Sequence, residues 1–305
     1  MVVRYDEGDL RVETADYVQA GDILIVPPTL AYLHPRKGLC FDDATGVADA
    51  IRSSTWTARS REQHQLPREG GRRQTLVEHV RGVMRGTSAR LSEDGAYRGT
   101  LRKILGSLEP DNDSDQLAAV IAQIATVAAA FHDLGKTDRC WQERARAIDP
   151  GFGDGLIGRT ARTDTRIGIP HTPPGFPATI KAAELLLGSV DSATYLVRAI
   201  ALAAARHHSS LLNPATVDHQ YEPHPGALGF VLAVLAEVDA PAEVRERAQA
   251  ILEAAAVRPD RQSVPLLLPN DDLFPIYALV GRAILMADRE DASGRELEQW
   301  RGDQR

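Results

Sequence analysis

The residues best suited to chemistry in this sequence are histidines and an aspartate at the ends of apolar segments. His132 and Asp133 close the segment AAAFHDLGKT, and the pair His207 and His208 closes ALAAARHHSS. Burying a carboxylate without a partner is costly, so Asp133 needs a cation, a metal ion or hydrogen bonds. Neighbouring residues on a helix point about 100° apart, so Asp133 can bridge two ions while His132 binds one of them. This arrangement predicts a metal centre.

Two further histidines become informative only in the company of these residues. His79 lies inside TLVEHVRGVM, and His171 lies in the loop GIPHTPPGF. Taken alone, a helix histidine is more often a packed or surface residue than a ligand, and a histidine in a proline-rich loop can equally be a turn residue. An HD pair, a separate HH pair and further single histidines are improbable as independent coincidences in one helical chain. We therefore favour metal binding.

The residues after Asp133 resemble the end of a phosphate-binding loop, but the resemblance fails. The first glycine of the G-x-x-x-x-G-K-T pattern would fall at Ala130, the intervening residues are bulky, and a helix precedes them instead of a strand. We interpret Gly135 instead as a residue suited to the left-handed conformation that ends a helix. The H-E-x-x-H and G-x-S-x-G patterns are also missing from the sequence.

The elements that position these residues are expected to be helices. From about Gln74 onward, apolar residues recur at three- and four-residue spacing, as in QLAAVIAQIATVAAAF and YLVRAIALAAA. Earlier, β-branched alternation punctuated by Gly and Pro, as in LRVET and GLCFDD, predicts short strands. We expect a small β-rich segment over 1–55, a basic linker over 56–73, a metal-dependent domain over 74–293 and a charged tail over 294–305.

Composition limits the possible functions. The 305 residues are 43% hydrophobic and 25% charged, which is ordinary for a soluble globular protein. The formal net charge of −7 argues against a protein that coats nucleic acid, because such binding depends on Lys and Arg that neutralise phosphates. The stretch from Arg52 to Arg73 is either a solvated arginine-rich linker or a local basic groove. Cys40 and Cys140 have no CxxC spacing, which argues against a disulfide scaffold or a thiolate zinc site.

The sequence predicts neither a membrane span nor a secretory signal. The longest apolar run, Leu117 to Phe131, is shorter than the roughly 20 residues needed to cross a bilayer, so we interpret it as a buried helix. No early stretch combines a basic start, an apolar middle and a small-residue cleavage site. We expect a cytoplasmic protein with no membrane partner.

An ordered set of motifs resembles one known family. The set runs LVEH, then FHDLGK followed by TDRCWQ, then a histidine before a helix, then RHH, then a late helix ending in MADREDAS. It is similar to the HD nuclease of the CRISPR type I interference helicase-nuclease, in the HD phosphohydrolase superfamily. The resemblance covers about Gln74 to Ser293. It implies an all-α HD-domain helical bundle that carries the β-rich N-terminal segment as a small appendage.

The resemblance implies a role for each residue of the centre. One ion would be held by His79, His132, Asp133 and Asp288. Asp133 would bridge to a second ion, whose other ligands would be His171, His207 and His208. Lys136, close to the HD pair, would face the substrate phosphate.

Two of these assignments have alternatives. The family usually has a glutamate directly after the histidine assigned here to His171, and this chain has a threonine there. His219 or His224 can therefore take the place of His171. Asp291 follows three residues after Asp288, close to the same face of a helix, and is an alternative ligand.

The activity implied by the resemblance is hydrolysis of single-stranded DNA by metal-activated water, with Asp133 and Lys136 as catalytic residues. Two divalent transition-metal ions, Fe, Mn, Co or Ni, would be the cofactors. Because the sequence has no Walker A loop, we expect a stand-alone subunit of CRISPR interference that acts with a separate helicase and the RNA-guided surveillance complex. Two alternatives are an HD phosphohydrolase acting on nucleotides or cyclic dinucleotides, and a non-catalytic helical subunit whose histidines are structural or regulatory.

Overall fold

The computed structural model describes residues 73–160, 167–188, 194–208, 213–265, 267 and 271–293, together with five short strands before residue 42. The chain divides into two compact units, Met1–Arg68 and Glu69–Arg305. The predicted charged tail lies outside the described residues. So does the predicted basic stretch, except for Arg73, which pairs with Asp149 at 2.6 Å.

Short antiparallel strands make up the described part of the first unit. β1 (Val2–Asp6) lies between β2 (Asp9–Glu13) and β3 (Ile23–Ile25) in one sheet, and β4 (Ala31–His34) pairs with β5 (Gly38–Phe41) in another. Strand β2 falls in the segment LRVET, and β5 falls in GLCFDD. The prediction of short strands in this region is confirmed.

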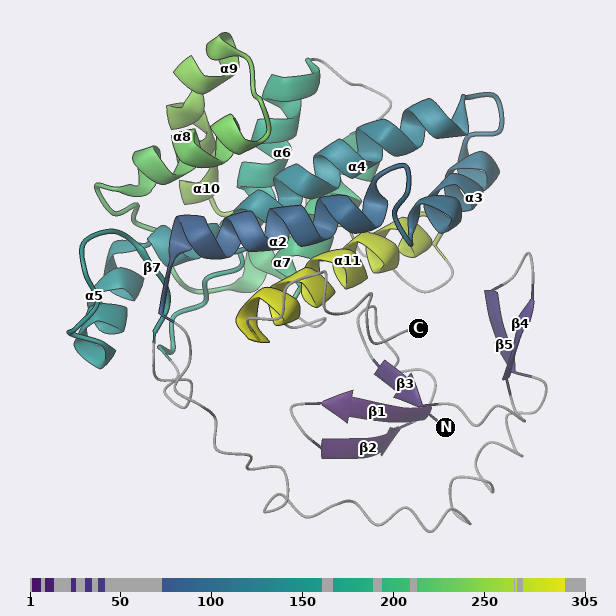
Figure 1. Cartoon of the computed structure of the whole chain (residues 1–305), viewed down its shortest axis with the longest axis horizontal. Coiled ribbons are helices and arrows are strands. Elements are labelled where there is room, and N and C mark those ends of the chain that lie inside the picture. Colours follow the sequence, from purple (N-terminus) through teal and green to yellow (C-terminus); the bar gives the residue numbers. More distant parts are fainter. Residues whose placement is uncertain are drawn as a thin grey trace. The chain divides into compact units, whose positions relative to one another are not determined.

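The described part of the second unit is mostly helical, as predicted (Figure 1). Its α-helices are α2 (Leu76–Leu91), α3 (Arg98–Leu108), α4 (Ser114–Phe131), α5 (Arg139–Ile148), α6 (Gly175–Leu187), α7 (Thr194–Ala205), α8 (Ala227–Glu237), α9 (Ala242–Glu246), α10 (Ala248–Ala256) and α11 (Phe274–Ser293). Two 3₁₀-helices, η3 (Leu134–Thr137) and η4 (Pro214–Thr216), and a small sheet of β6 (Gln74–Thr75) and β7 (Ile157–Arg159) complete it.

Helix α4 lies at the centre of this body and contacts α2, α3, α6 and α7. Its side chains from Val127 to Phe131 are buried, and Asp113 caps its amino end by accepting from the backbone N–H groups of Asp115 and Gln116. By length and composition alone, Ser114–Thr137 is apolar enough to cross a membrane, but 67% of its most apolar window is buried within the protein. The interpretation of this run as a core helix fits that burial.

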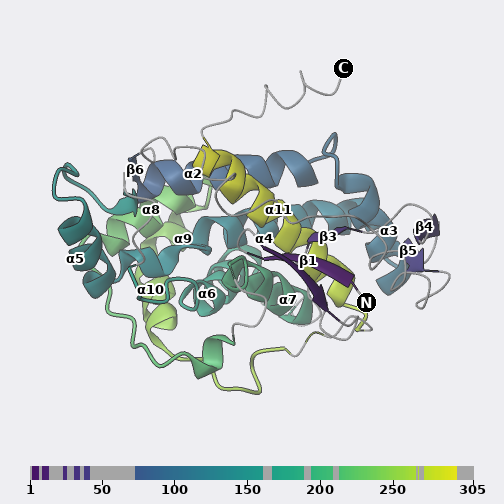
Figure 2. The ribbon, with the colours of Figure 1, turned by 90° about the horizontal axis from the view of Figure 1, so that it is seen from below.

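Helix α11 packs along α2, which is the most extensive contact between two helices (Figures 1 and 2). Glycines on α2 permit the close approach. A Cβ at Gly86 would lie 2.7 Å from the Cβ of Ala287, and one at Gly82 would lie 2.7 Å from the Cγ of Asp291. Both distances are too short for real contacts. The Cβ of Ala287 is fixed to its helix, so glycine is needed at Gly86, whereas a Cβ at Gly82 would require the Asp291 side chain to move. The approach brings the carboxylates of α11 next to the histidine of α2.

A buried glutamine joins η3 to β7. The side-chain nitrogen of Gln142 donates to the carbonyl oxygens of Lys136 (2.6 Å) and Ile157 (3.0 Å), and its side-chain oxygen accepts from the backbone N–H of Ile157 (2.9 Å). Gly158 lets β7 lie against the start of α2, because a Cβ there would be 2.8 Å from the Cα of Leu76. These contacts place the end of β7, Arg159, beside the centre of the helical body.

Candidate metal centre

His132 and Asp133 enter the core at the carboxyl end of α4. Phe131 is the last residue of the helix, His132 is its C-cap, and Asp133 directly precedes η3. Their side chains are 0% and 1% exposed. Bulk water therefore solvates neither group, and the expected burial of this pair at a helix end is confirmed.

Two histidines are oriented by the same local hydrogen bond. Nδ1 of His132 lies 2.6 Å from the carbonyl oxygen of Ala129, and Nδ1 of His207 lies 2.6 Å from that of Ala204. Because a carbonyl oxygen can only accept, each Nδ1 carries the hydrogen, and in the neutral ring Nε2 keeps its lone pair. Both Nε2 atoms are buried without a hydrogen-bond partner among the described residues. A buried lone pair without a donor is what a metal ion would satisfy.

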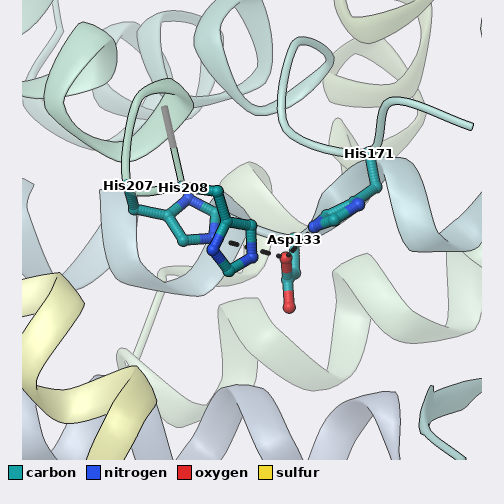
Figure 3. A group of neighbouring side chains, drawn as sticks. All are labelled: Asp133, His171, His207 and His208. Atoms are coloured by element: carbon teal, nitrogen blue, oxygen red, sulfur yellow. Dashed lines mark ion pairs between the residues drawn. The ribbon is translucent and has the colours of Figure 1, made fainter. Parts of the chain in front are cut away.

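One group of ligand atoms gathers around Oδ1 of Asp133 (Figure 3). Nε2 of His171 lies 3.3 Å from this oxygen, and Nε2 of His207 lies 3.6 Å from it. His208, whose side chain is exposed, completes the group, and one ligand atom from each of the four residues lies within 4.8 Å of the others. Oδ1 of Asp133 is buried without a hydrogen-bond partner in the described chain, and so is Nε2 of His171. This group can hold a metal ion.

A second group gathers around the other oxygen of the same carboxylate. Nε2 of His79 lies 2.9 Å from Oδ2 of Asp133, and Nε2 of His132 lies 3.3 Å from it. These three buried residues also meet the spacing for a metal site. Asp133 therefore stands between two sets of imidazoles, which is the arrangement required of a carboxylate that bridges two ions.

Lys136 is the cation that balances Asp133 in this structure. Its Nζ lies 2.6 Å from Oδ2 of Asp133 and donates to the carbonyl oxygen of Gly158 at 3.1 Å. The ammonium also lies 5.8 Å from the ring centre of Trp141, within range of a cation–π contact. Lys136 thus touches the carboxylate of Asp133 directly, and its expected role toward substrate phosphate stays a prediction.

Helix α11 adds two carboxylates with different partners. Oδ1 of Asp288 lies 3.4 Å from Nε2 of His79 and accepts from Nη2 of Arg159 at 2.7 Å. Oδ2 of Asp291 shares a hydrogen bond of 2.7 Å with Nδ1 of His79. Within the described chain, neither belongs to a group of converging ligand atoms. Asp291 orients the ring of His79 through Nδ1, whereas Asp288 lies near Nε2, the nitrogen that faces Asp133.

The pKa shifts follow from burial and from these neighbours. Burial, with His208 and His132 close by, lowers the pKa of His207 well below its usual range, so this ring is neutral and able to bind a metal ion. Burial opposes protonation of His132, but the carboxylates of Asp133 and Asp288 outweigh it and raise its pKa. Burial alone would raise the pKa of Asp133, yet His132 and Lys136 hold it well below its usual range. Asp133 is therefore ionised at neutral pH.

The role expected of Gly135 is wrong. It does not have the positive φ of a left-handed helix end and lies instead within η3. Glycine is required because another chain segment approaches closely: a Cβ at this position would lie 2.7 Å from the carbonyl carbon of His171. The N–H of Gly135 donates to that carbonyl at 3.0 Å. This hydrogen bond ties the loop of His171 to the HD segment.

The two alternatives to His171 have other partners. Nε2 of His219 lies 3.3 Å from Oδ2 of Asp138, the residue that caps α5. Nδ1 of His224 accepts from the backbone N–H of Gly226 at 3.0 Å. Among the described residues, only His171 of these three belongs to a group of ligand atoms around Asp133.

No family model, curated protein or solved structure matches this chain. The expected membership of the HD superfamily therefore stays a prediction. The geometry of the centre fits divalent ions: four buried atoms, one from each of His132, Asp133, His171 and His207, have no hydrogen-bond partner among the described residues. Imidazole nitrogens favour transition metals over Mg²⁺, which prefers oxygen ligands.

Arg159 and Gln142 were not predicted as parts of the site. Arg159 stands 80 residues after His79 in a segment without helical periodicity, and no local pattern distinguishes it from a surface arginine. Gln142 belongs to the motif TDRCWQ, which did carry a signal. The sequence did not show that Gln142 joins η3 to β7, because these contacts are visible only in the structure.

The choice between His171 and His219 can be tested by metal content. We expect His171→Ala to reduce bound Mn²⁺ from two ions per chain to one, because one of the two groups loses a ligand. His219→Ala is the matched control and should keep both ions. Equilibrium dialysis followed by elemental analysis measures the difference. Equal metal content in the two variants would contradict this assignment.

Proposed function

We propose that this protein is a two-metal phosphodiesterase that cleaves single-stranded DNA. The observation that carries the proposal is the pair of buried ligand groups sharing Asp133. A non-catalytic subunit with structural histidines is less well supported, because such histidines would use both ring nitrogens in hydrogen bonds. His132 and His207 each leave Nε2 without a hydrogen-bond partner in the described chain.

The proposed reaction divides between the ions and the chain. Bound Fe, Mn, Co or Ni ions would supply Lewis-acid activation of water and of the scissile phosphate. The residues of the chain fix the geometry: the Nδ1 hydrogen bonds of His132 and His207 hold their rings, and Asp133 spans both ligand groups. Lys136, whose Nζ lies 2.6 Å from Asp133, would supply positive charge beside the reacting phosphate.

The substrate follows from the resemblance to the HD nuclease of CRISPR type I interference. The resemblance favours single-stranded DNA delivered by a separate helicase and an RNA-guided surveillance complex in the cytoplasm. The acidic net charge of −7 agrees with substrate delivered by partners, because the chain is not suited to coating nucleic acid.

A second candidate is an HD phosphohydrolase for nucleotides or cyclic dinucleotides. A cavity of about 410 Å³ favours this candidate. It is lined by prolines on both sides of His171, by the end of α10, and by residues 214, 217–221 and 257–259. This volume is in the range of small-ligand sites. The metal ligands themselves do not line this cavity.

Circular single-stranded DNA separates these functions. We expect the Mn²⁺-loaded protein to convert the circle into fragments and to lose this activity with EDTA. The Asp133→Asn protein, purified in parallel, excludes contaminating nucleases. Release of phosphate from nucleotides, or opening of cyclic dinucleotides, with the DNA circle left intact would favour the second candidate. Failure to bind Mn²⁺ would overturn both.

A further inference from the structure

Arg159 is placed next to the metal centre by backbone contacts. It ends β7, where its Cα pairs with that of Gln74 in β6. Gly158 allows this strand to lie against Leu76, the first residue of α2. His79 is three residues further along α2, so it lies on the same side of the helix. The guanidinium therefore reaches the histidine from the end of a paired strand.

The guanidinium is held by groups of the centre itself. Nη2 of Arg159 donates to Oδ1 of Asp288 at 2.7 Å and to its backbone carbonyl at 3.2 Å. Nε lies 3.3 Å from Nδ1 of His79 and 4.0 Å from Oδ2 of Asp291. The side chain is 25% exposed, so water screens this charge only partly. Arg159 is thus the internal counter-ion of Asp288.

A metal ion and this guanidinium would compete for the same carboxylate. Oδ1 of Asp288 lies 3.4 Å from Nε2 of His79, the nitrogen that would bind the ion. The same oxygen accepts the hydrogen bond from Arg159. Two positive groups on one oxygen repel each other, more strongly where the site is partly buried. Asp288 accordingly does not join the converging ligand atoms of His79, His132 and Asp133 in the described chain.

We propose that Arg159 sets the metal affinity of this half of the centre by competing with the ion for Asp288. The inference rests on the proposed metal function and assigns Arg159 a positioning role. When the ion binds Asp288, the guanidinium must withdraw from Oδ1. The metal affinity of the chain is therefore lower than its ligands alone would give.

The test is calorimetric titration with Mn²⁺ as the only ligand. We expect Arg159→Gln to bind the ion of the His79 group at least about tenfold more tightly than the unmodified protein, a change of about 1.4 kcal/mol. Arg159→Lys keeps a positive charge and should stay closer to the unmodified protein. Arg81→Gln is the matched control, because Arg81 lies on α2 in an exposed ion pair with Glu237 at 2.6 Å. Its affinity should not change.

A second variant links the effect to the carboxylate. In an Asp288→Asn background, Arg159→Gln should no longer raise the affinity, because the two groups would no longer compete. Thermal unfolding in EDTA should show Arg159→Gln less stable than the unmodified protein, with a larger rise in Tm on adding Mn²⁺. Unchanged or weaker binding by Arg159→Gln would overturn the inference while leaving the metal centre in place. No Mn²⁺ binding by the unmodified protein would overturn the proposed function as well.

Discussion

Asp133→Asn should abolish both metal binding and DNA cleavage. The carboxylate belongs to both ligand groups, so its loss removes a shared ligand and not one of several equivalent ones. We expect cleavage to fall by more than about 1000-fold, as when a residue central to a catalytic unit is removed. Bound Mn²⁺ should fall from two ions per chain to fewer than one. Elemental analysis and a single-stranded DNA cleavage assay measure the two effects.

The same substitution should also reduce stability through Lys136. Nζ of this lysine is buried 2.6 Å from Asp133, and an asparagine would leave the charge without its partner. Breaking a buried ion pair in this way costs about 3–5 kcal/mol. Adding Lys136→Met should restore most of the free energy of unfolding, because an apolar chain can pack against Trp141. It should not restore metal binding.

Asp115→Asn is the matched control for this experiment. Asp115 lies on the same helix, α4, and pairs with Arg102 at 2.8 Å, but both side chains are at least half exposed. Exposed pairs contribute about 0–1 kcal/mol, so stability and activity should hardly change. If Asp133→Asn kept two ions, the bridging role would be wrong. If Lys136→Met failed to raise its stability, the account of the ion pair would be wrong.

Gly135→Ala should remove one ion and leave the other. The new Cβ would meet the backbone of His171, 2.7 Å from its carbonyl carbon, and a backbone group cannot rotate away as a side chain can. The hydrogen bond from Gly135 to His171 would lengthen, and the histidine would move away from Asp133. The His79 and His132 group does not depend on this loop.

We expect Gly135→Ala to bind one Mn²⁺ per chain, to cleave DNA about 10–100-fold more slowly, and to lose about 1–3 kcal/mol of unfolding free energy. Urea unfolding and metal analysis give these quantities. Gly229→Ala, in α8, is the control: nothing lies within 4 Å of its added Cβ, so it should gain about 0.5–1 kcal/mol. Two ions per chain in Gly135→Ala would contradict the proposed link between this glycine and His171.

Much of the architecture could be predicted because it depends on local pattern. Apolar residues at helical spacing predicted the helices from Gln74 onward, and alternation with Gly and Pro predicted the short strands before them. The burial of His132 and Asp133 could also be predicted, since an apolar helix such as α4 carries its last residues into the core. These features follow from neighbours in sequence, which share one element and one environment.

The composition of the site depended on contacts between distant segments, and sequence could only offer candidates. His171 was the predicted ligand, but His219 and His224 stayed open as replacements until packing placed His171 beside Asp133, joined to Gly135 by a backbone hydrogen bond. Asp288 was named as a ligand, but the structure pairs it with Arg159, a residue that sequence did not single out.

By itself, the sequence determined a mostly helical chain with an HD pair at the end of a buried helix, because periodicity and burial are local properties. Only the tertiary structure decided which imidazoles converge on Asp133 and which cations balance the carboxylates. The physical reason is that distances between side chains far apart in sequence depend on close approaches such as those at Gly86, Gly135 and Gly158. A glycine in the sequence does not reveal which segment will lie against it.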